Sequence, residues 1–138
     1  MKFIGREKEL NALEREYQRN SGFIVVYGRR RVGKTTLIKQ FIRGKDALYF
    51  LASEESERQN LNQFTEKLAD FTGQSFLAQS RFESWLDAFK VLVSYQPEKK
   101  KILVIDEFQY LVNGNPAYPS IFQKAWDEIL KDNQVTVI

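Results

Sequence analysis

Short apolar runs and longer helical repeats alternate along this chain. Four runs of consecutive, mainly apolar residues predict strands, at 23–27, 47–51, 102–105 and 135–138. A run without polar alternation indicates a strand that is buried on both faces, as in a parallel sheet covered by helices. We therefore predict an α/β fold with a mainly parallel sheet and helices on both of its faces.

Between the strands, apolar residues recur three and four positions apart, which is the spacing of an amphipathic helix. These repeats predict helices at about 10–17, 34–42, 61–72, 80–93 and 120–130. Ser80, with Glu83 three residues later, resembles a capping box at the start of the fourth helix. The density of turn-forming residues at 113–119 predicts an exposed loop before the fifth.

Aromatic residues lie at helical spacing on the third and fourth predicted helices. They are Phe64, Phe71, Phe82, Trp85 and Phe89. An aromatic stripe of this kind is far more often part of a core than a platform on which nucleic-acid bases stack. We therefore expect these two helices to cover the sheet.

The strongest local motif lies between the first predicted strand and the helix after it. There the chain reads Gly28, Arg29, Arg30, Arg31, Val32, Gly33, Lys34, Thr35 and Thr36. This order fits G-x-x-x-x-G-K-[ST], the pattern of a phosphate-binding P-loop, and a strand before and a helix after it are the expected context. Glycines let the backbone N–H groups turn toward phosphates. We expect Lys34 to contact the β- and γ-phosphates and Thr35 to be a ligand of Mg²⁺.

A second motif ends the third predicted strand, where four apolar residues lead into Asp106 and Glu107. The carboxyl ends of parallel strands form the edge at which open α/β sheets bind ligands. Acids after a strand are also common as helix caps or in solvated turns. Together with a P-loop, however, Asp106 is expected to hold Mg²⁺ and Glu107 to activate a water molecule, which favours hydrolysis over transfer to a positioned acceptor.

Composition narrows the chemistry of these 138 residues. The sequence contains no cysteine and no histidine, which excludes disulfides, thiol nucleophiles, zinc sites and histidine acid–base catalysis. Any catalysis here depends on carboxylates and a metal ion. No apolar run approaches the 18 residues of a membrane span and no secretory leader is evident, so we expect a soluble, cytoplasmic protein without membrane contacts.

The charge balance is only mildly basic and leaves the role of the basic runs open. Lysine and arginine number 21 against 18 acidic residues, for a net charge of +3. The runs Arg29–Arg31 and Lys99–Lys101 are typical of a solvated surface, and the alternative is contact with nucleic acid. A net charge this small does not identify a polyanionic partner.

Three segments together resemble the archaeal-type P-loop ATPases, prokaryotic proteins related to the AAA+ and STAND groups. The segments are Phe3-Ile4-Gly5-Arg6-Glu7-Lys8-Glu9-Leu10, the P-loop motif, and Ile105-Asp106-Glu107-Phe108-Gln109. The resemblance spans nearly the whole chain. It implies ATP and Mg²⁺ as ligands, and a three-layer P-loop NTPase fold with strand order 5-1-4-3-2. The strand at 135–138 would then lie between those at 23–27 and 102–105.

The resemblance also implies a place for the adenine, against Phe3, Ile4 and Gly5. Arg6 would contact the nucleotide, and the alternative is a solvent-exposed arginine at the start of a helix. The family continues with a sensor residue, a fifth strand, an arginine acting on the γ-phosphate, a helical lid and usually a winged-helix region. We therefore expect residues 1–138 to form one P-loop ATPase domain that is truncated after its fourth strand and has little turnover by itself.

Three functions stay open at this point. The first is the ATP-binding and ATP-hydrolysing core of an AAA+/STAND-like switch ATPase. The second is a binding module that nucleotide occupancy regulates without significant hydrolysis. The third is a nucleic-acid-binding domain that uses the basic runs. A homo-oligomer, or a protein or nucleic-acid partner, would engage the family's regions that lie beyond this sequence.

Overall fold

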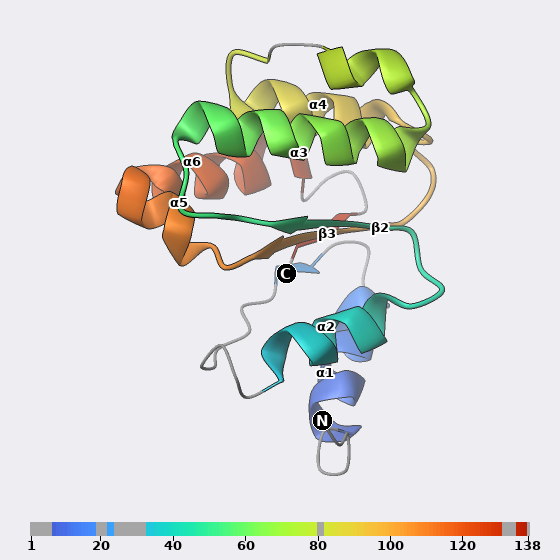
Figure 1. Ribbon diagram of the computed structural model, residues 1–138. Coiled ribbons are helices and arrows are strands. Elements are labelled where there is room, and N and C mark those ends of the chain that lie inside the picture. Colours follow the sequence, from blue (N-terminus) through green and yellow to red (C-terminus); the bar gives the residue numbers. More distant parts are fainter. Residues whose placement is uncertain (1–6, 19–21, 24–32, 80–81, 131–134, 138) are drawn as a thin grey trace.

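The computed structural model describes residues 7–18, 22–23, 33–79, 82–130 and 135–137 (Figure 1). The helices are α1 (Glu7–Tyr17), α2 (Lys34–Ile42), α3 (Glu57–Thr72), α4 (Trp85–Ser94), α5 (Gln109–Gly114) and α6 (Tyr118–Ala125). A 3-10 helix, η1 (Ser75–Gln79), follows α3, and a π-helical turn, η2 (Trp126–Leu130), extends α6. The strands are β1 (Gly22–Phe23), β2 (Ala47–Leu51), β3 (Lys101–Asp106) and β4 (Val135–Val137). The chain is therefore a mixed α/β domain, as expected.

In the described residues, the strands form one four-stranded sheet in the order β1-β4-β3-β2. Every neighbouring pair is parallel. For these four strands the order agrees with the expected one, with β4 between β1 and β3. The place of a fifth strand stays a prediction. Strand β1 is described over Gly22–Phe23, and residues 24–27 of the predicted strand lie outside the described residues.

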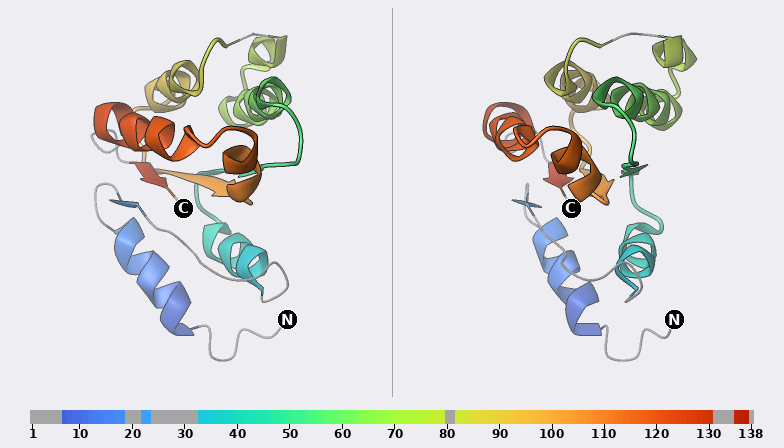
Figure 2. Two further views of the ribbon diagram at one scale, coloured as in Figure 1. Left: turned by 90° about the vertical axis from the view of Figure 1, so that its left-hand side faces the viewer. Right: turned by 60° about the vertical axis from the view of Figure 1, so that its left-hand side comes forward.

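Helices cover both faces of the sheet (Figure 2). The helices α3, α4 and α6 lie over one face, while α1 and α2 lie beneath the other (Figure 1). The central strand β3 serves both layers, because Leu103 and Ile105 join the core on the α3 and α4 side and Ile102 and Val104 join the core on the α1 and α2 side. This alternation follows from the pleat of a strand.

The prediction that the apolar strands are buried on both faces is confirmed for β3 and wrong for β2. All six residues of β3 are buried. In β2, Leu48 and Phe50 are buried, whereas Leu51 is 52% exposed. Leu51 is exposed because β2 lies at the edge of the sheet, where only one face of the strand is fully covered. The other face of β2 borders the candidate site described below.

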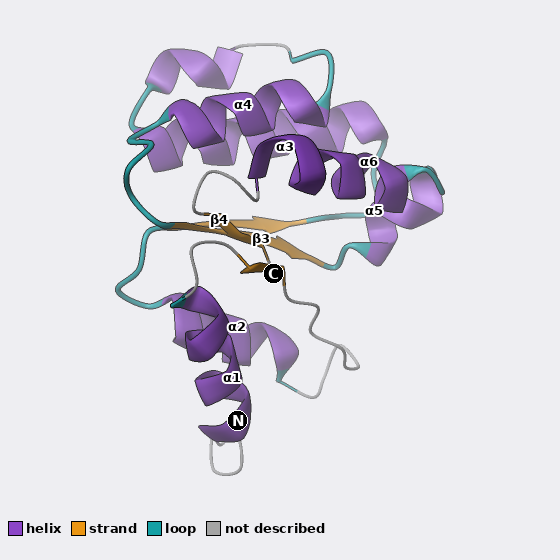
Figure 3. Cartoon of the chain, turned by 180° about the vertical axis from the view of Figure 1, so that it is seen from behind, coloured by secondary structure: helices purple, strands orange, loops and turns teal. Residues whose placement is uncertain are grey.

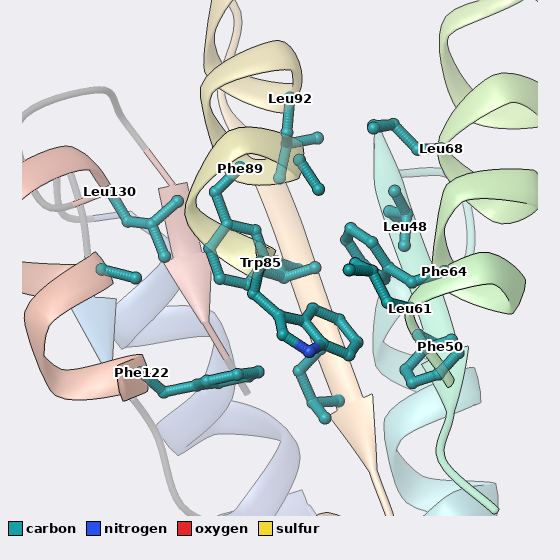
Figure 4. Packing of buried hydrophobic residues seen from close by; sticks show 14 of the residues in the cluster. Leu48, Phe50, Leu61, Phe64, Leu68, Trp85, Phe89, Leu92, Phe122 and Leu130 are labelled. Atoms are coloured by element: carbon teal, nitrogen blue, oxygen red, sulfur yellow. The ribbon is translucent and has the colours of Figure 1, made fainter. Parts of the chain in front are cut away.

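The aromatic stripe forms the core between the sheet and the upper helices (Figure 4). Phe64 of α3 and Phe89 of α4 are fully buried and meet edge to face. Trp85 packs against both rings, and its indole Nε1 donates a hydrogen bond to the Tyr118 hydroxyl at 3.0 Å. The expectation that these aromatic side chains are core rather than a stacking platform is confirmed for this cluster.

The ends of several helices differ from the predictions. Helix α4 begins at Trp85, with Ser84 as its cap accepting from the Asp87 N–H at 3.3 Å, so the predicted start at residue 80 is wrong. Residue 80 itself lies outside the described residues. The capping box that the structure contains is at Ser56 and Gln59, at the start of α3, and was not predicted.

The predicted loop at 113–119 is also wrong at both ends. Helix α5, which was not predicted, extends to Gly114, and α6 begins at Tyr118 (Figure 3). Pro119 lies in the first turn of α6, where a helix tolerates proline because the N–H groups there have no partner within the helix. Pro119, which was predicted to belong to a loop, therefore lies at the start of a helix. Of the helices that the structure describes, none is both long enough and apolar enough to cross a membrane.

Candidate functional site

The start of α2 carries the last four residues of the predicted P-loop, Gly33 to Thr36. Gly33 caps the helix with φ 84° and ψ 17°, a left-handed conformation that glycine adopts without strain. Its carbonyl accepts from the Leu37 N–H at 2.8 Å, which closes the first turn. Lys34 and Thr35 follow at the N-terminus, where backbone N–H groups and the helix dipole favour anions.

Most of the remaining residues that were predicted to bind the nucleotide lie in segments that the structure does not describe. Those outside the described residues are Gly28, Arg29, Arg30, Arg31, Val32, Phe3, Ile4, Gly5 and Arg6. Their predicted roles stay predictions. Thr36 is described and lies exposed on the first turn of α2.

Asp106 and Glu107 meet the start of α2 at the carboxyl end of β3. The Thr35 hydroxyl donates to Asp106 Oδ2 at 2.7 Å. The Lys34 ammonium lies 3.5 Å from Asp106 Oδ1 and 3.4 Å from Glu107 Oε1. Both acids are buried, with 2% of Asp106 and 7% of Glu107 exposed. The structure thus brings together the four residues predicted for catalysis and metal binding, although more than 70 positions separate the two motifs.

Tyr49 completes the surroundings of Asp106 and was not predicted. It lies on the edge strand β2, paired in register with Val104, and its hydroxyl donates to Asp106 Oδ2. The backbone N–H of Glu107 donates to the other oxygen, Oδ1, at 2.9 Å. Both oxygens of this carboxylate therefore have hydrogen-bond donors. The one signal in the sequence was a tyrosine, with a polar end, inside an otherwise apolar strand.

These contacts decide the charge of the two side chains. Burial opposes ionisation of Asp106, but the hydrogen bonds from Tyr49 and Thr35 and the charge of Lys34 outweigh it and hold the pKa of Asp106 below its usual value. Burial, followed by the hydrogen bond to Asp106, raises the pKa of Tyr49 above its ordinary value. The carboxylate is consequently an anion at neutral pH, and the phenol keeps the proton that it donates.

Glu107 has an unusual backbone conformation for a residue with a side chain. Its φ is 59°, in the left-handed region, which costs on the order of 1–3 kcal/mol for residues other than glycine. The Gln109 side-chain amide donates to Glu107 Oε2, while Lys34 approaches Oε1. Such strain is common at functional sites, where the surrounding contacts hold a side chain in one place. The expected base is thus fixed from two sides.

An open pocket of about 470 Å³ lies beside these residues. Its lining includes Thr35, Tyr49 and Glu107 of the site, together with Lys39, Ser53 and Tyr110. The volume is within the range of small-molecule sites. Thr35 and Glu107 therefore border a space that is large enough for a small ligand.

The chemistry of the site fits a hard cation only in part. A hydroxyl and a carboxylate within hydrogen-bond distance are the oxygen ligands that Mg²⁺ prefers. Within the described ranges, no group of three or more histidine, cysteine, aspartate or glutamate residues is arranged to hold a metal ion. A Mg²⁺ ion here would therefore need further oxygens from a phosphate ligand and from water, which is how Mg²⁺ is usually held beside phosphates.

Comparison with known proteins identifies the kind of domain to which this site belongs. The model of a family described as an ATPase domain predominantly from Archaea matches residues 3–138. An uncharacterized protein of Methanocaldococcus jannaschii is 34% identical over 137 residues, which cover 99% of this chain and 28% of that relative. The present chain thus spans little more than a quarter of that relative's length.

Two shorter proteins of the same organism are also similar. An uncharacterized protein is 33% identical over 88 residues, which cover 64% of this chain and 84% of the relative. A third relative, named as an uncharacterized ATP-binding protein, is 52% identical over 44 residues, which cover 31% of this chain and 75% of the relative.

Proposed function

This chain belongs to the family of ATPase domains found predominantly in Archaea, and we propose that it binds ATP with Mg²⁺ and hydrolyses it. One observation carries the proposal: Lys34 and Thr35, at the start of α2, meet the buried pair Asp106 and Glu107 at the end of β3. The name of one relative, an ATP-binding protein, supports ATP as the ligand.

Lys34 is the residue that recognises the phosphates. In this conformation its ammonium group is paired with two carboxylates. An incoming triphosphate offers it more negative charge, so Lys34 exchanges part of this pairing for phosphate oxygens. The N-terminus of α2 adds its dipole and backbone N–H groups to the same attraction.

Thr35 and Asp106 would hold the Mg²⁺ ion, which supplies neutralisation of the phosphate charge when it is bound. Glu107 would accept the proton of the attacking water, because its carboxylate lies 3.4 Å from the Lys34 ammonium and the residue borders an open pocket. An arginine or sensor residue from another segment is not needed for binding, but its addition would raise turnover. We therefore infer that these 138 residues bind ATP and have little turnover by themselves.

A switch ATPase of the AAA+/STAND type is the form of this function that we propose. A nucleotide-regulated binding module without significant hydrolysis is the second candidate. It is favoured by the engagement of both Glu107 oxygens, one by Lys34 and the other by Gln109, since a base held in this way is not free to reach a water molecule. Either form would act with partners, as a homo-oligomer or with another protein or a nucleic acid.

Replacing Thr35 tests the proposed metal site. We expect Thr35→Ala to lose the strengthening of ATP binding by Mg²⁺, because the hydroxyl is gone, while ATP still binds weakly without Mg²⁺. Removing a residue that only hydrogen-bonds to a metal ligand lowers metal affinity by about 10–100-fold, and we expect the loss of a direct ligand to lower it at least as much. Isothermal titration calorimetry with and without Mg²⁺ measures both values.

The matched control is Thr35→Ser, which keeps a hydroxyl on the same carbon. We expect this variant to retain the Mg²⁺ effect within about threefold, since serine and threonine are interchangeable at this position of the P-loop motif. An alanine variant that responds to Mg²⁺ like the wild type would show that Thr35 is not a metal ligand.

A further inference from the structure

We propose that Tyr49 is a positioning residue for Asp106 and that its hydroxyl determines how tightly the site binds Mg²⁺. The inference rests on the proposed function, and it adds a residue outside both sequence motifs. Tyr49 would act on the metal ion through Asp106, to which its hydroxyl donates.

The contacts around Asp106 show how its carboxylate is oriented. The hydroxyls of Tyr49 and Thr35 both donate to Oδ2, and the Glu107 N–H donates to Oδ1. These donors come from β2, from α2 and from the end of β3, so they approach the carboxylate from three separate elements. A buried carboxylate with donors on both oxygens cannot rotate without breaking a hydrogen bond. Hydrogen bonds of this kind hold a metal ligand in the orientation in which it binds the ion.

The hydroxyl of Tyr49 is needed for more than packing. The tyrosine ring packs against the apolar cluster between the sheet and α2, and the Lys39 ammonium lies 5.1 Å from the centre of the ring. A phenylalanine would make both of these contacts. The hydrogen bond from the hydroxyl to Asp106 is a contact that phenylalanine cannot make. The position of Tyr49 on the edge strand places that hydroxyl beside an open pocket as well.

Loss of this hydroxyl would disturb the site in one defined way. Asp106 would keep its bonds to Thr35 and to the Glu107 N–H, but its Oδ2 would lose one of two donors. Only the Thr35 hydroxyl would then hold Oδ2, so the carboxylate could turn toward Lys34, whose ammonium is already 3.5 Å from Oδ1, by giving up one hydrogen bond at Oδ2 instead of two. A closer ion pair with lysine competes with a divalent cation for the same carboxylate. Binding of Mg²⁺ should weaken, while the phosphate contacts of Lys34 and α2 remain.

The test is a Mg²⁺ titration of ATP binding in the wild type, Tyr49→Phe and Tyr17→Phe. Tyr17 is the matched control, because its ring packs against Phe41 in the same apolar cluster, at the far end of α2 from the site. For Tyr49→Phe we expect the half-saturating Mg²⁺ concentration to rise about 10-fold or more, the usual loss for an outer contact of a metal site. Affinity for ATP without Mg²⁺ should stay within about twofold, and Tyr17→Phe should match the wild type.

A double-mutant cycle with Asp106→Asn separates positioning from a general structural role. If Tyr49 acts through Asp106, adding Tyr49→Phe to Asp106→Asn produces no further change in the Mg²⁺ response. Two results would overturn the inference: a wild-type Mg²⁺ response in Tyr49→Phe, or an equal loss of ATP affinity with and without Mg²⁺. If the wild type itself does not bind ATP, or binds it without any effect of Mg²⁺, that result contradicts the proposed function and with it the inference for Tyr49.

Discussion

Replacing Lys34 with alanine should lower the affinity for ATP by about 100-fold or more. Two effects add here. The variant loses a positive charge that would lie beside the phosphates. It also removes the lysine paired with the buried acids Asp106 and Glu107, whose negative charge then repels the phosphates more strongly. One pair of charges 4 Å apart interacts with about 4 kcal/mol at an effective dielectric constant of 20, and 100-fold in affinity corresponds to about 2.8 kcal/mol. Equilibrium titration with a fluorescent ATP analogue at constant salt measures the loss.

The control for this variant is Lys39→Ala. Lys39 belongs to the same helix and carries the same charge, but its ammonium lies over the Tyr49 ring rather than beside the carboxylates. Its removal should change ATP affinity by about threefold at most, because an exposed charge is screened by solvent and salt. An equal loss in both variants would mean that net positive charge, rather than the contact made by Lys34, determines binding.

Glu107→Gln should retain ATP binding and lose hydrolysis. Glutamine has nearly the same shape as glutamate, and its backbone is equally strained at a φ of 59°. The substitution therefore leaves the backbone strain at this position unchanged. Its amide cannot accept a proton from water, and loss of a general base costs about 10²–10⁴-fold in rate. The affinity for ATP should stay the same or rise slightly, since one negative charge near the phosphates is gone. Single-turnover phosphate release measures the rate even when wild-type turnover is slow.

Glu54→Gln is the matched control for the base. Glu54 lines the same pocket but is exposed to solvent, so its change should leave the rate within about twofold of the wild type. Equal phosphate release by the wild type and Glu107→Gln, both above background, would reject Glu107 as the base. Tight ATP binding with wild-type release at background would instead support the nucleotide-regulated binding module.

The sheet could be predicted from the sequence because residues 102–105 of its strand β3 are all apolar and show no polar alternation. Six buried residues in β3 require cover on both faces, and the helical repeats before and after it provide that cover. The same reasoning failed at β2. A run of five apolar residues does not reveal whether its strand is central or at the edge, and the exposure of Leu51 depends on that position.

The two motifs of the site could also be predicted to meet. Asp106 ends a parallel strand and Lys34 begins the helix after another, and in such sheets these positions lie at one edge. Tyr49 could not be found in this way, because its contact with Asp106 depends on the register of β2 against β3. Nothing local in the sequence determines that register.

Errors at the helix ends have a physical cause as well. Ser80 and Ser84 both precede the apolar face of α4, and each is followed three residues later by an acid. The structure uses Ser84, whose cap leaves Trp85 at the first position of the helix, buried between α3 and α6. The two serines offer similar helix-capping signals in the sequence. The start of α4 at Trp85 therefore depends on the tertiary packing of that side chain.

The most direct test of the central claim is a calorimetric titration of the 138-residue chain with ATP, with and without Mg²⁺. If the residues at the start of α2 and the end of β3 form one site for phosphates and a metal ion, one equivalent of ATP binds saturably and Mg²⁺ strengthens the binding about 10-fold or more. Absence of saturable binding by a folded chain, or binding that is indifferent to Mg²⁺, would contradict this function.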